Sequence, residues 1–342
     1  MLVDFSVPRL LGHVGGKPRI NFSWKKVGSK SRLIGNPNKP LRLLHELFGR
    51  FLRERIFATD ESGYGLRKLP SSTGAVRGSN PLRNALRHAE GKFFYITDLA
   101  EAYQNVSLER LALLIVYLVE FTENGGDISF RAFGEDDRRE YLREHPFFPE
   151  VLDMLSRYFA GPGGTGLAVG GPLSPFLMNL YCEVYLDAPL RRFLPYRGLT
   201  YTRYVDDLVF SSSFVIGSDT RRILRGFISQ SGFGINHEKS KILSMTMGTV
   251  HITKIGLSPQ VDGSVRLVFS QKKRRKLHGM IKSYLRRQSD WPEKVSGYIA
   301  EFLHYYKNVA VKTRTDLKTF RLCKEFEAEW SKYKTRSPKR RR

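Results

Sequence analysis

Two adjacent aspartates lie between two apolar runs of β type. The segment LTYTRYVDDLVFSSS holds Asp206 and Asp207, and it predicts a strand, a tight turn and a second strand. Neighbouring carboxylates repel and raise one another's pKa, so a divalent cation is expected between them. Asp98, at the end of the apolar run KFFYIT, is the natural third ligand. Such oxygen ligands suit Mg²⁺, and two ions would polarise an attacking 3′-oxygen and stabilise a leaving pyrophosphate.

A solvated Asp-Asp turn is the alternative interpretation of this pair, and the surrounding segments argue against it. The order of segments over roughly residues 20–270 resembles a reverse transcriptase, with a thumb expected after it. YVDD at 204–207 resembles motif C of that family. DLAEAY at 98–103 resembles motif A, in which a metal-binding aspartate is followed five residues later by an aromatic side chain.

The resemblance implies a set of roles for residues of these two motifs. Asp98, Asp206 and Asp207 would be the catalytic metal ligands for two Mg²⁺ ions, with Mn²⁺ as a substitute. Tyr103 would be the steric gate that stacks under the sugar and rejects a 2′-hydroxyl. Leu99 would also contact the incoming nucleotide.

A third segment, GGPLSPFLMNL at 170–180, resembles motif B. The resemblance implies that Gly170, Gly171 and Ser174 lie beside the nascent base pair, where glycine allows close approach of the backbone. Val169 stands where most relatives carry glutamine. A polar contact to the nucleotide or template is therefore missing, which leaves templated and untemplated synthesis both open.

Two basic segments also match the family. GINHEKSKI at 234–242 resembles motif D, and Lys239 falls where relatives carry a lysine near the departing pyrophosphate, a general acid. WKKVGSKSR at 24–32 resembles the fingers hairpin. Lys25 and Arg32 flank its turn and would bind the triphosphate, arginine by bidentate contact. Simple solvation of these cations is the alternative.

The subtype is indicated by a short pattern before motif A. Asn84-Ala-Leu-Arg-His88 matches the NAxxH pattern of retron enzymes, and positions 84 and 88 share one helix face, so both side chains would bind one nucleic-acid partner. Lys254-Ile255-Gly256 replaces the Val-Thr-Gly of retrons, of which only glycine survives. GGPLSP is closer to group II intron-like enzymes.

Four functions therefore remain open. The first is a bacterial retron-type reverse transcriptase that copies a cognate structured noncoding RNA, primes from its 2′-hydroxyl and serves anti-phage defence. Its partners would be that RNA, an RNA–DNA hybrid, deoxynucleoside triphosphates and an effector protein encoded nearby. The others are a defence-associated enzyme making repetitive, protein-primed or untemplated DNA, a group II intron-like enzyme, and a catalytically silent RNA-binding scaffold.

The resemblance implies an α+β fold shaped as a right hand, with fingers, an antiparallel-sheet palm and a helical thumb. Patterning predicts a hairpin near 21–37, helices near 40–52, 81–89, 108–121, 172–186 and 218–231, a second hairpin from 250–257 and 264–269, and helices over 271–334. The expected parts are fingers and N-terminal segment at 1–90, palm with the remaining fingers at 91–249 including an acidic insertion at 121–150, thumb at 250–334, and a disordered basic tail at 335–342.

The charge is unevenly distributed along the chain. The net charge is +24 over 342 residues, and residues 271–342 hold 22 Lys/Arg against 7 Asp/Glu, which is +15. Such a basic segment binds a phosphate backbone through counter-ion release. The residues expected to contact a duplex are Lys272, Lys273, Arg274, Arg275, Lys276, Arg286 and Arg287.

Other features exclude whole classes of protein. Cys182 and Cys323 lie far apart, which argues against a disulfide framework or a cysteine zinc site. The longest apolar stretch, 111–121, is too short to span a bilayer. The N-terminus lacks the basic region of a signal peptide. We therefore expect a cytoplasmic protein with no membrane partner.

Overall fold

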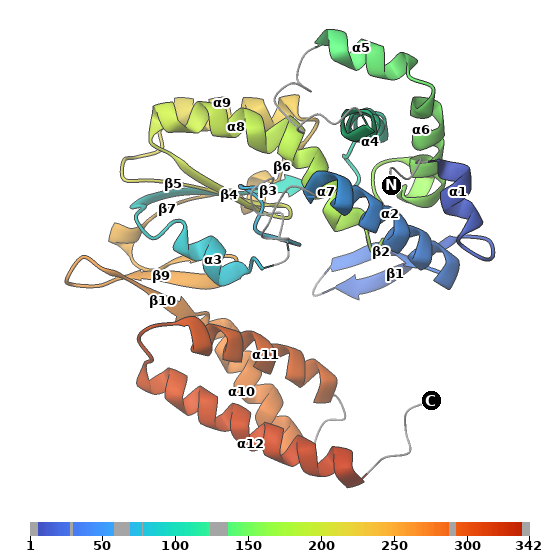
Figure 1. Cartoon of the computed structure of the whole chain (residues 1–342). Coiled ribbons are helices and arrows are strands. Elements are labelled where there is room, and N and C mark those ends of the chain that lie inside the picture. Colours follow the sequence, from blue (N-terminus) through green and yellow to red (C-terminus); the bar gives the residue numbers. More distant parts are fainter. Residues whose placement is uncertain are drawn as a thin grey trace. The chain divides into compact units, whose positions relative to one another are not determined.

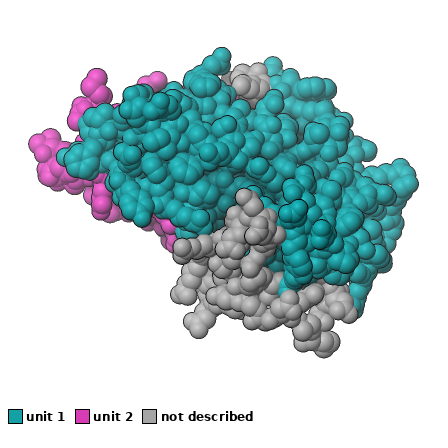
Figure 2. Space-filling model, turned by 90° about the horizontal axis from the view of Figure 1, so that it is seen from above, with its two compact units in different colours: residues 1–80, 91–243 teal, residues 81–90, 244–342 magenta. Residues whose placement is uncertain are grey.

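The computed structural model describes residues 6–27, 30–57, 69–76, 78–123, 136–286 and 292–336. The chain divides into two compact units, one formed by 1–80 with 91–243 and the other by 81–90 with 244–342 (Figure 2). Residues 81–90 thus belong with the C-terminal part of the chain, whereas the sequence places them with the fingers. The assignment of fingers, palm and thumb stays a prediction.

A small sheet forms the centre of the first unit (Figure 1). Its strand order is β4–β5–β3–β6, and β7 also pairs with β3. The pairs β4–β5, β5–β3 and β3–β6 are antiparallel. The strands are β3 (Phe93–Ala100), β4 (Thr200–Tyr204), β5 (Asp207–Ser212), β6 (Gly234–Ile235) and β7 (Lys241–Ser244). Strand β3 continues through Asp98, at which the sequence pattern ends it, because Leu99 and Ala100 pair with β6.

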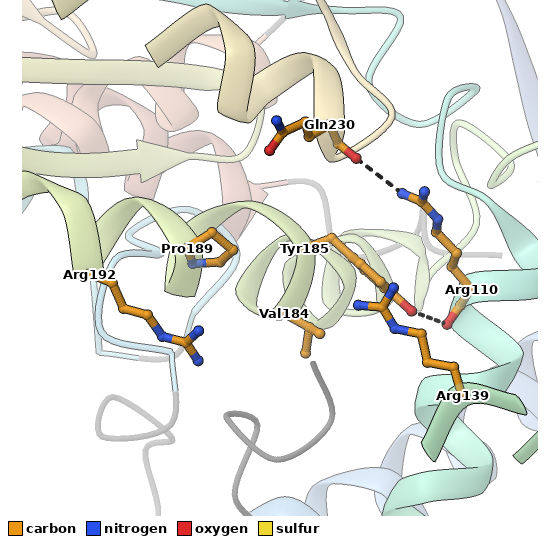
Figure 3. Close-up of a pocket in the computed structure, with 7 residues that line it drawn as sticks. All are labelled: Arg110, Arg139, Val184, Tyr185, Pro189, Arg192 and Gln230. Atoms are coloured by element: carbon orange, nitrogen blue, oxygen red, sulfur yellow. Dashed lines mark hydrogen bonds between the residues drawn. The ribbon is translucent and has the colours of Figure 1, made fainter. Parts of the chain in front are cut away.

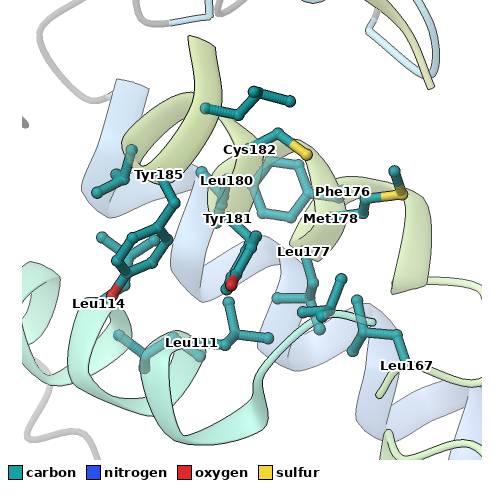
Figure 4. Packing of buried hydrophobic residues seen from close by; sticks show 14 of the residues in the cluster. Leu111, Leu114, Leu167, Phe176, Leu177, Met178, Leu180, Tyr181, Cys182 and Tyr185 are labelled. Carbon is teal, nitrogen blue, oxygen red and sulfur yellow. The ribbon is translucent and has the colours of Figure 1, made fainter. Parts of the chain in front are cut away.

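Helix α4 (Leu108–Glu123) forms the core of this unit together with α7 (Ser174–Cys182). Every side chain from Leu111 to Val119 is buried, as expected for a helix that is apolar all round. Figure 4 shows α4, with Leu111 and Leu114, facing Tyr181 and Tyr185. The other helices that pack here include α2 (Lys39–Phe57) and α6 (Phe147–Tyr158).

The acidic segment predicted at 121–150 contains part of this core, including the buried Leu142. Helix α5 (Asp136–Glu144) is followed by α6, which buries Val151, Met154 and Leu155. The predicted insertion, 121–150, therefore includes the first turn of a core helix. Residues 124–135 lie outside the described residues.

The predicted hairpin near residue 28 is confirmed. Strands β1 (Ile20–Val27) and β2 (Lys30–Pro37) pair antiparallel along their whole length. The backbone N–H of Gly35 donates to the carbonyl of Val169 at 2.7 Å. The hairpin is thereby tied to the loop that precedes α7.

The second unit contains a three-stranded sheet and three long helices. The sheet order is β10–β9–β8, and α3 (Pro81–Leu86) packs on β8 and β9. The predicted hairpin of 250–257 with 264–269 is confirmed where β9 pairs antiparallel with β10. Its first strand is not continuous, because Thr253 and Lys254 turn the chain with φ of +44° and +75°. The elements are β8 (Val250–Ile252), β9 (Ile255–Pro259), β10 (Val265–Phe269), α10 (Gln271–Leu285), α11 (Pro292–Asn308) and α12 (Arg314–Arg336).

The remaining elements are one helix of 13 residues, α9, and several short helices and turns. They are α1 (Val7–Gly12), α8 (Ala188–Phe193), α9 (Ser218–Gln230), the 3₁₀ turns η2 (Pro162–Gly164), η4 (Leu194–Arg197), η5 (His237–Lys239) and η6 (Met245–Met247), and the π-helical turn η3 (Glu183–Asp187). Within the described ranges, no helix is long and apolar enough to cross a membrane. Both cysteines are free and buried.

His45 of α2 holds the loop before α7 in place, a role that the sequence patterns do not indicate. Its ring stacks on Phe159 with centroids 4.2 Å apart. Its Nε2 lies 2.9 Å from the carbonyl of Tyr158, and its Nδ1 lies 3.4 Å from the backbone N–H of Leu173. This pattern requires neutral imidazole, with Nε2–H donating and Nδ1 accepting. Burial lowers the pKa of His45 to about 4, against the opposing effect of the Tyr158 contact.

We predict that the protein loses stability below pH 6.5 in part through His45. The unfolded chain protonates this histidine near pH 6.5 and the folded chain near pH 4, so the unfolded state binds more protons between these values. Stability contributed by the neutral ring is present above pH 6.5 and falls with pH, by roughly 2 kcal/mol at pH 5. Urea unfolding of wild type and His45→Gln at pH 7 and pH 5 measures this. If the free energy of unfolding falls equally from pH 7 to pH 5 in the two proteins, His45 is not a cause of the loss.

Candidate functional site

Three carboxylates meet at the end of the sheet in the first unit. Asp98 on β3 lies directly opposite Asp207 on β5 in the strand register. Asp206 precedes β5 in the connecting turn. One carboxylate oxygen from each residue lies within 4.8 Å of those from the other two. We call these residues the acidic triad.

The turn between β4 and β5 brings both neighbouring aspartates to the same place. Tyr204 pairs with Asp207, which leaves Val205 and Asp206 as the two turn residues. Val205 adopts φ of +60°, and this left-handed residue breaks the alternation that would point successive side chains to opposite faces. The backbone N–H of Leu99 donates to the carbonyl of Asp206 at 2.9 Å, which ties the turn to β3.

The triad carries unfavourable negative charge when no cation is bound. Burial, then the charges of Asp206 and Asp98, raise the pKa of Asp207 to about 6. Burial and then Asp98 raise the pKa of Asp206 as well. Like charges directly opposite one another destabilise a strand pair. A hard divalent cation would neutralise the charge and prefers this all-oxygen donor set, so the residues present fit such an ion.

Lys239 already supplies one positive charge to the triad. Its Nζ lies 2.5 Å from Oδ2 of Asp98. The side chain of Asn236 accepts from the backbone N–H of Lys239 at the start of η5, and Asn236 itself donates its N–H to the carbonyl of Asp98 at 2.8 Å. A cation at Asp98 must compete with this ammonium group. The predicted role of Lys239 as a general acid near a departing pyrophosphate stays a prediction.

Tyr103 lies in the turn after β3 and faces the same region. Its carbonyl accepts from the N–H of Leu167 at 2.7 Å. Burial, followed by the charge of Asp206, raises the pKa of Tyr103 to about 12, so its phenol is neutral and near that carboxylate. Leu99, by contrast, is buried and contributes its backbone to the turn.

The loop before α7 needs its glycines for close contacts. Gly170 has φ of +98°, and a Cβ there would lie 2.5 Å from the carbonyl oxygen of Gly35. A Cβ on Gly171 would lie 2.5 Å from Oγ of Ser174. Ser174 is buried, and its hydroxyl has no partner among the described residues. Gly170 is exposed, whereas Ser174 is not, and their predicted contacts with a nucleotide stay predictions.

The two basic residues of the β1–β2 hairpin lie side by side. Lys25 and Arg32 are cross-strand partners in the register, and both are exposed. The charge of Arg32 lowers the pKa of Asp206, although less than burial raises it. Arg32 is therefore close enough to the acidic triad for its charge to affect the pKa of Asp206.

The residues of the NAxxH pattern are buried in the second unit. Asn84 and His88 are 0% and 1% exposed, and the Asn84 amide donates to Oγ1 of Thr253 at 3.3 Å. These side chains therefore support the fold of α3 against the β8–β9 turn in this conformation. Their predicted contact with a nucleic acid stays a prediction.

The basic residues of α10 divide into two groups. Lys273 pairs with Glu301, and Arg274 pairs with the buried Asp316 at 2.6 Å, so both stabilise the helices of this unit. Lys272, Arg275, Lys276 and Lys282 of α10 are exposed and available to a phosphate backbone, as is Arg286 just after the helix. Arg287 lies outside the described residues.

A basic pocket lies apart from the triad in the first unit (Figure 3). Arg110, Arg139 and Arg192 line it, and the guanidinium groups of Arg110 and Arg139 lie 5.3 and 5.7 Å from the ring centre of Tyr185. None of these residues belongs to the predicted site.

Three polar residues missed by sequence reasoning lie directly under the turn of the triad. Arg203, Asp187 and Asn179 are all buried and are joined by hydrogen bonds. The signal in the sequence is a charged residue inside the β-branched and aromatic strand TYTRY, since a buried arginine needs an ionic partner.

Comparison with known proteins gives a consistent result. The family model of reverse transcriptase (RNA-dependent DNA polymerase) matches residues 157–281, which include Asp206 and Asp207. The retron Ec73 reverse transcriptase of Escherichia coli is 29% identical over 81% of this chain and 79% of its own length. The retron Mx65 reverse transcriptase of Myxococcus xanthus is 24% identical over 75% of this chain and 56% of its own length. The chain thus spans little more than half of the Mx65 protein.

Solved structures give a weaker likeness. Apo telomerase from Candida tropicalis, truncated from its C-terminal domain, aligns with 75% of this chain and 58% of its own at 13% identity and a TM-score of 0.46.

We predict that Mn²⁺ added without nucleotide binds at the acidic triad in competition with Lys239. Asp98→Asn should weaken binding at least tenfold, because it removes a ligand charge. Lys239→Gln should tighten it about two- to fivefold, since a partly exposed ion pair contributes up to about 1 kcal/mol. Electron paramagnetic resonance of free Mn²⁺ measures the dissociation constant of each variant and of wild type. Unchanged affinity in Asp98→Asn would contradict a metal site here.

Proposed function

We propose, on the premise that this chain belongs to the retron-type reverse transcriptases, that it is an RNA-directed DNA polymerase copying a structured noncoding RNA into DNA. The observation that carries the proposal is the acidic triad, three carboxylates with oxygens within 4.8 Å at the end of one sheet. A catalytically silent scaffold would not need to gather them against their mutual repulsion.

Mg²⁺ is the ion we assign to the triad, with Mn²⁺ as a substitute. Asp98, Asp206 and Asp207 would hold it, and two such ions supply charge stabilisation to the attacking 3′-oxygen and the leaving pyrophosphate. Lys239 would leave Asp98 and donate its proton to the departing pyrophosphate, as a general acid. Its ion pair with Asp98 supports this role, because the ammonium group already lies at the acidic triad.

Other residues of the first unit would select and hold the nucleotide. Arg32 and Lys25 would bind the triphosphate of a deoxynucleotide, because they are exposed neighbours and Arg32 already affects Asp206. The neutral ring of Tyr103 would lie under the sugar and exclude a 2′-hydroxyl. Gly170 would allow the base pair to approach the loop before α7.

The proposed partners follow from the relatives and the charge. The cognate RNA would serve as template and primer, with synthesis starting from a 2′-hydroxyl and leaving a branched RNA–DNA product. Exposed cations of α10 would contact the RNA–DNA hybrid through its backbone. A cytoplasmic role in anti-phage defence, with an effector protein encoded nearby, completes the proposal.

Untemplated or repetitive synthesis is the second candidate, and Val169 is the observation that favours it. This half-buried side chain has no polar group to contact a base. Assays with each single deoxynucleotide, with and without bound RNA, distinguish the two candidates. Copying of the RNA sequence supports the first, and homopolymer synthesis without RNA supports the second.

We predict that Asp206→Asn abolishes DNA synthesis. The loss of one ligand charge should lower the rate by at least about a thousandfold, because catalysis by the triad depends on its metal ions. Primer extension on the RNA that co-purifies with the chain measures this rate, and sequencing that RNA identifies the template. Asp153→Asn, an exposed acid on α6, is the control and should be silent. DNA synthesis by Asp206→Asn at the wild-type rate would refute the proposed function.

We predict that Tyr103→Val allows ribonucleotides to be incorporated. Removing the ring opens space for a 2′-hydroxyl, and the preference for deoxynucleotides should fall on the order of ten- to a hundredfold. Tyr103→Phe keeps the ring and should keep the preference. The ratio of kcat/KM for the two nucleotide types measures selectivity. Equal selectivity in Val and wild-type proteins would remove Tyr103 from the gate.

A further inference from the structure

We propose that Arg203 is a positioning residue for the acidic triad, holding the left-handed turn at Val205 and thereby fixing where the carboxylates of Asp206 and Asp207 point. This inference rests on the proposed function, because it concerns the same metal site. Arg203 is buried and would act through the turn, without touching substrate or metal.

The guanidinium of Arg203 is held by a complete set of buried partners. Its Nε lies 3.1 Å from both carboxylate oxygens of Asp187, and its Nη2 donates to Oδ2 at 2.7 Å. Arg203 and Asp187 are both 0% exposed. The hydroxyl of Tyr201 donates to Oδ1 of Asp187 at 2.7 Å. An unpaired buried charge is very unfavourable, so this arrangement leaves the guanidinium a single position.

From that position Arg203 reaches the turn itself. Its Nη1 donates to the carbonyl of Val205 at 3.0 Å and to Oδ1 of Asn179 at 2.9 Å. The carbonyl of Asp206, in the next peptide group along the chain, accepts from the backbone N–H of Leu99. The peptide groups before and after Asp206 are therefore both held, and the direction of its side chain follows.

The turn needs such support because its conformation is unfavourable for valine. Val205 has φ of +60°, where a β-branched residue is a genuine outlier. Two-residue hairpin turns usually place glycine or asparagine at such a position. A hydrogen bond to the Val205 carbonyl stabilises the one backbone conformation that brings Asp206 beside Asp98.

The same network also fastens a second segment against the turn. The N–H of Arg203 donates to the carbonyl of Ser71, and its carbonyl accepts from the N–H of Thr73 at 2.7 Å. The Asn179 amide donates to the carbonyl of Gly74 at 2.9 Å. A Cβ on Gly74 would lie only 2.7 Å from the backbone nitrogen of Val205. The chain at Gly74 thus lies against the turn and leaves it no room to relax.

Two variants disturb the turn in independent ways. Arg203→Lys keeps the charge but loses the planar fork that contacts Asp187 and Val205 together. Gly74→Ala removes no interaction and instead presses a methyl group on Val205. The matched control is Arg191→Lys, which alters the pair of Arg191 with the buried Glu183 and its hydrogen bond to Oγ of Ser71. It leaves the hydrogen bond between the Arg203 N–H and the Ser71 carbonyl in place.

The experiment measures the Mn²⁺ affinity of the full chain without nucleotide by electron paramagnetic resonance. Thermal unfolding checks that each variant is folded. Steady-state kinetics give kcat and KM for deoxynucleotides. We expect Arg203→Lys and Gly74→Ala to weaken Mn²⁺ binding about tenfold or more and to lower kcat, with KM for nucleotide within about twofold. Arg191→Lys should lower thermal stability while leaving Mn²⁺ affinity unchanged.

The outcomes separate this inference from the proposed function. If wild type binds Mn²⁺ and makes DNA but folded Arg203→Lys and Gly74→Ala bind Mn²⁺ as tightly as wild type, the positioning role is overturned alone. If Arg203→Lys does not fold, Gly74→Ala decides by the same readout. If wild type neither binds Mn²⁺ nor makes DNA, the proposed function falls and this inference with it.

Discussion

The three carboxylates of the acidic triad repel one another, and several separate elements offset that repulsion. Their oxygens lie within 4.8 Å of one another at the end of the sheet, and burial adds to the unfavourable charge. The opposing contributions come from separate elements: the register of β3 and β5, the cation of Lys239 and the buried support beneath the turn. A site of this kind is organised before any ligand arrives, so that a divalent ion meets ligands already in place.

Local patterns explain what could be predicted. The β1–β2 hairpin, the strands around Asp206 and helix α4 follow from alternation, turn residues and helical period, which act over a few neighbours. The three aspartates could be selected because adjacent acids between apolar strands are costly without a partner. The side-by-side placement of Lys25 and Arg32 likewise follows from the position of the predicted hairpin turn, because that position decides which residues of the two strands pair.

Contacts between distant segments explain what could not. Arg203 meets Asp187 and Asn179 across 16 and 24 positions of the chain, and no local pattern predicts such a pair. The division of 250–257 into two strands depends on left-handed residues that are not glycine. Asn84 matches a motif and is nevertheless buried, because a short pattern carries no information on what packs over it. In α10, the acids of α11 and α12 decide which cations stay exposed.

The contact between the β1–β2 hairpin and the loop before α7 has a consequence for how this protein can diverge. The N–H of Gly35 bonds to the carbonyl of Val169, which every amino acid possesses. The docking of the two segments is therefore blind to the side chain at position 169. A single substitution can therefore change that side chain while the hairpin stays attached, and in the proposed polymerase it would change the group presented to a base.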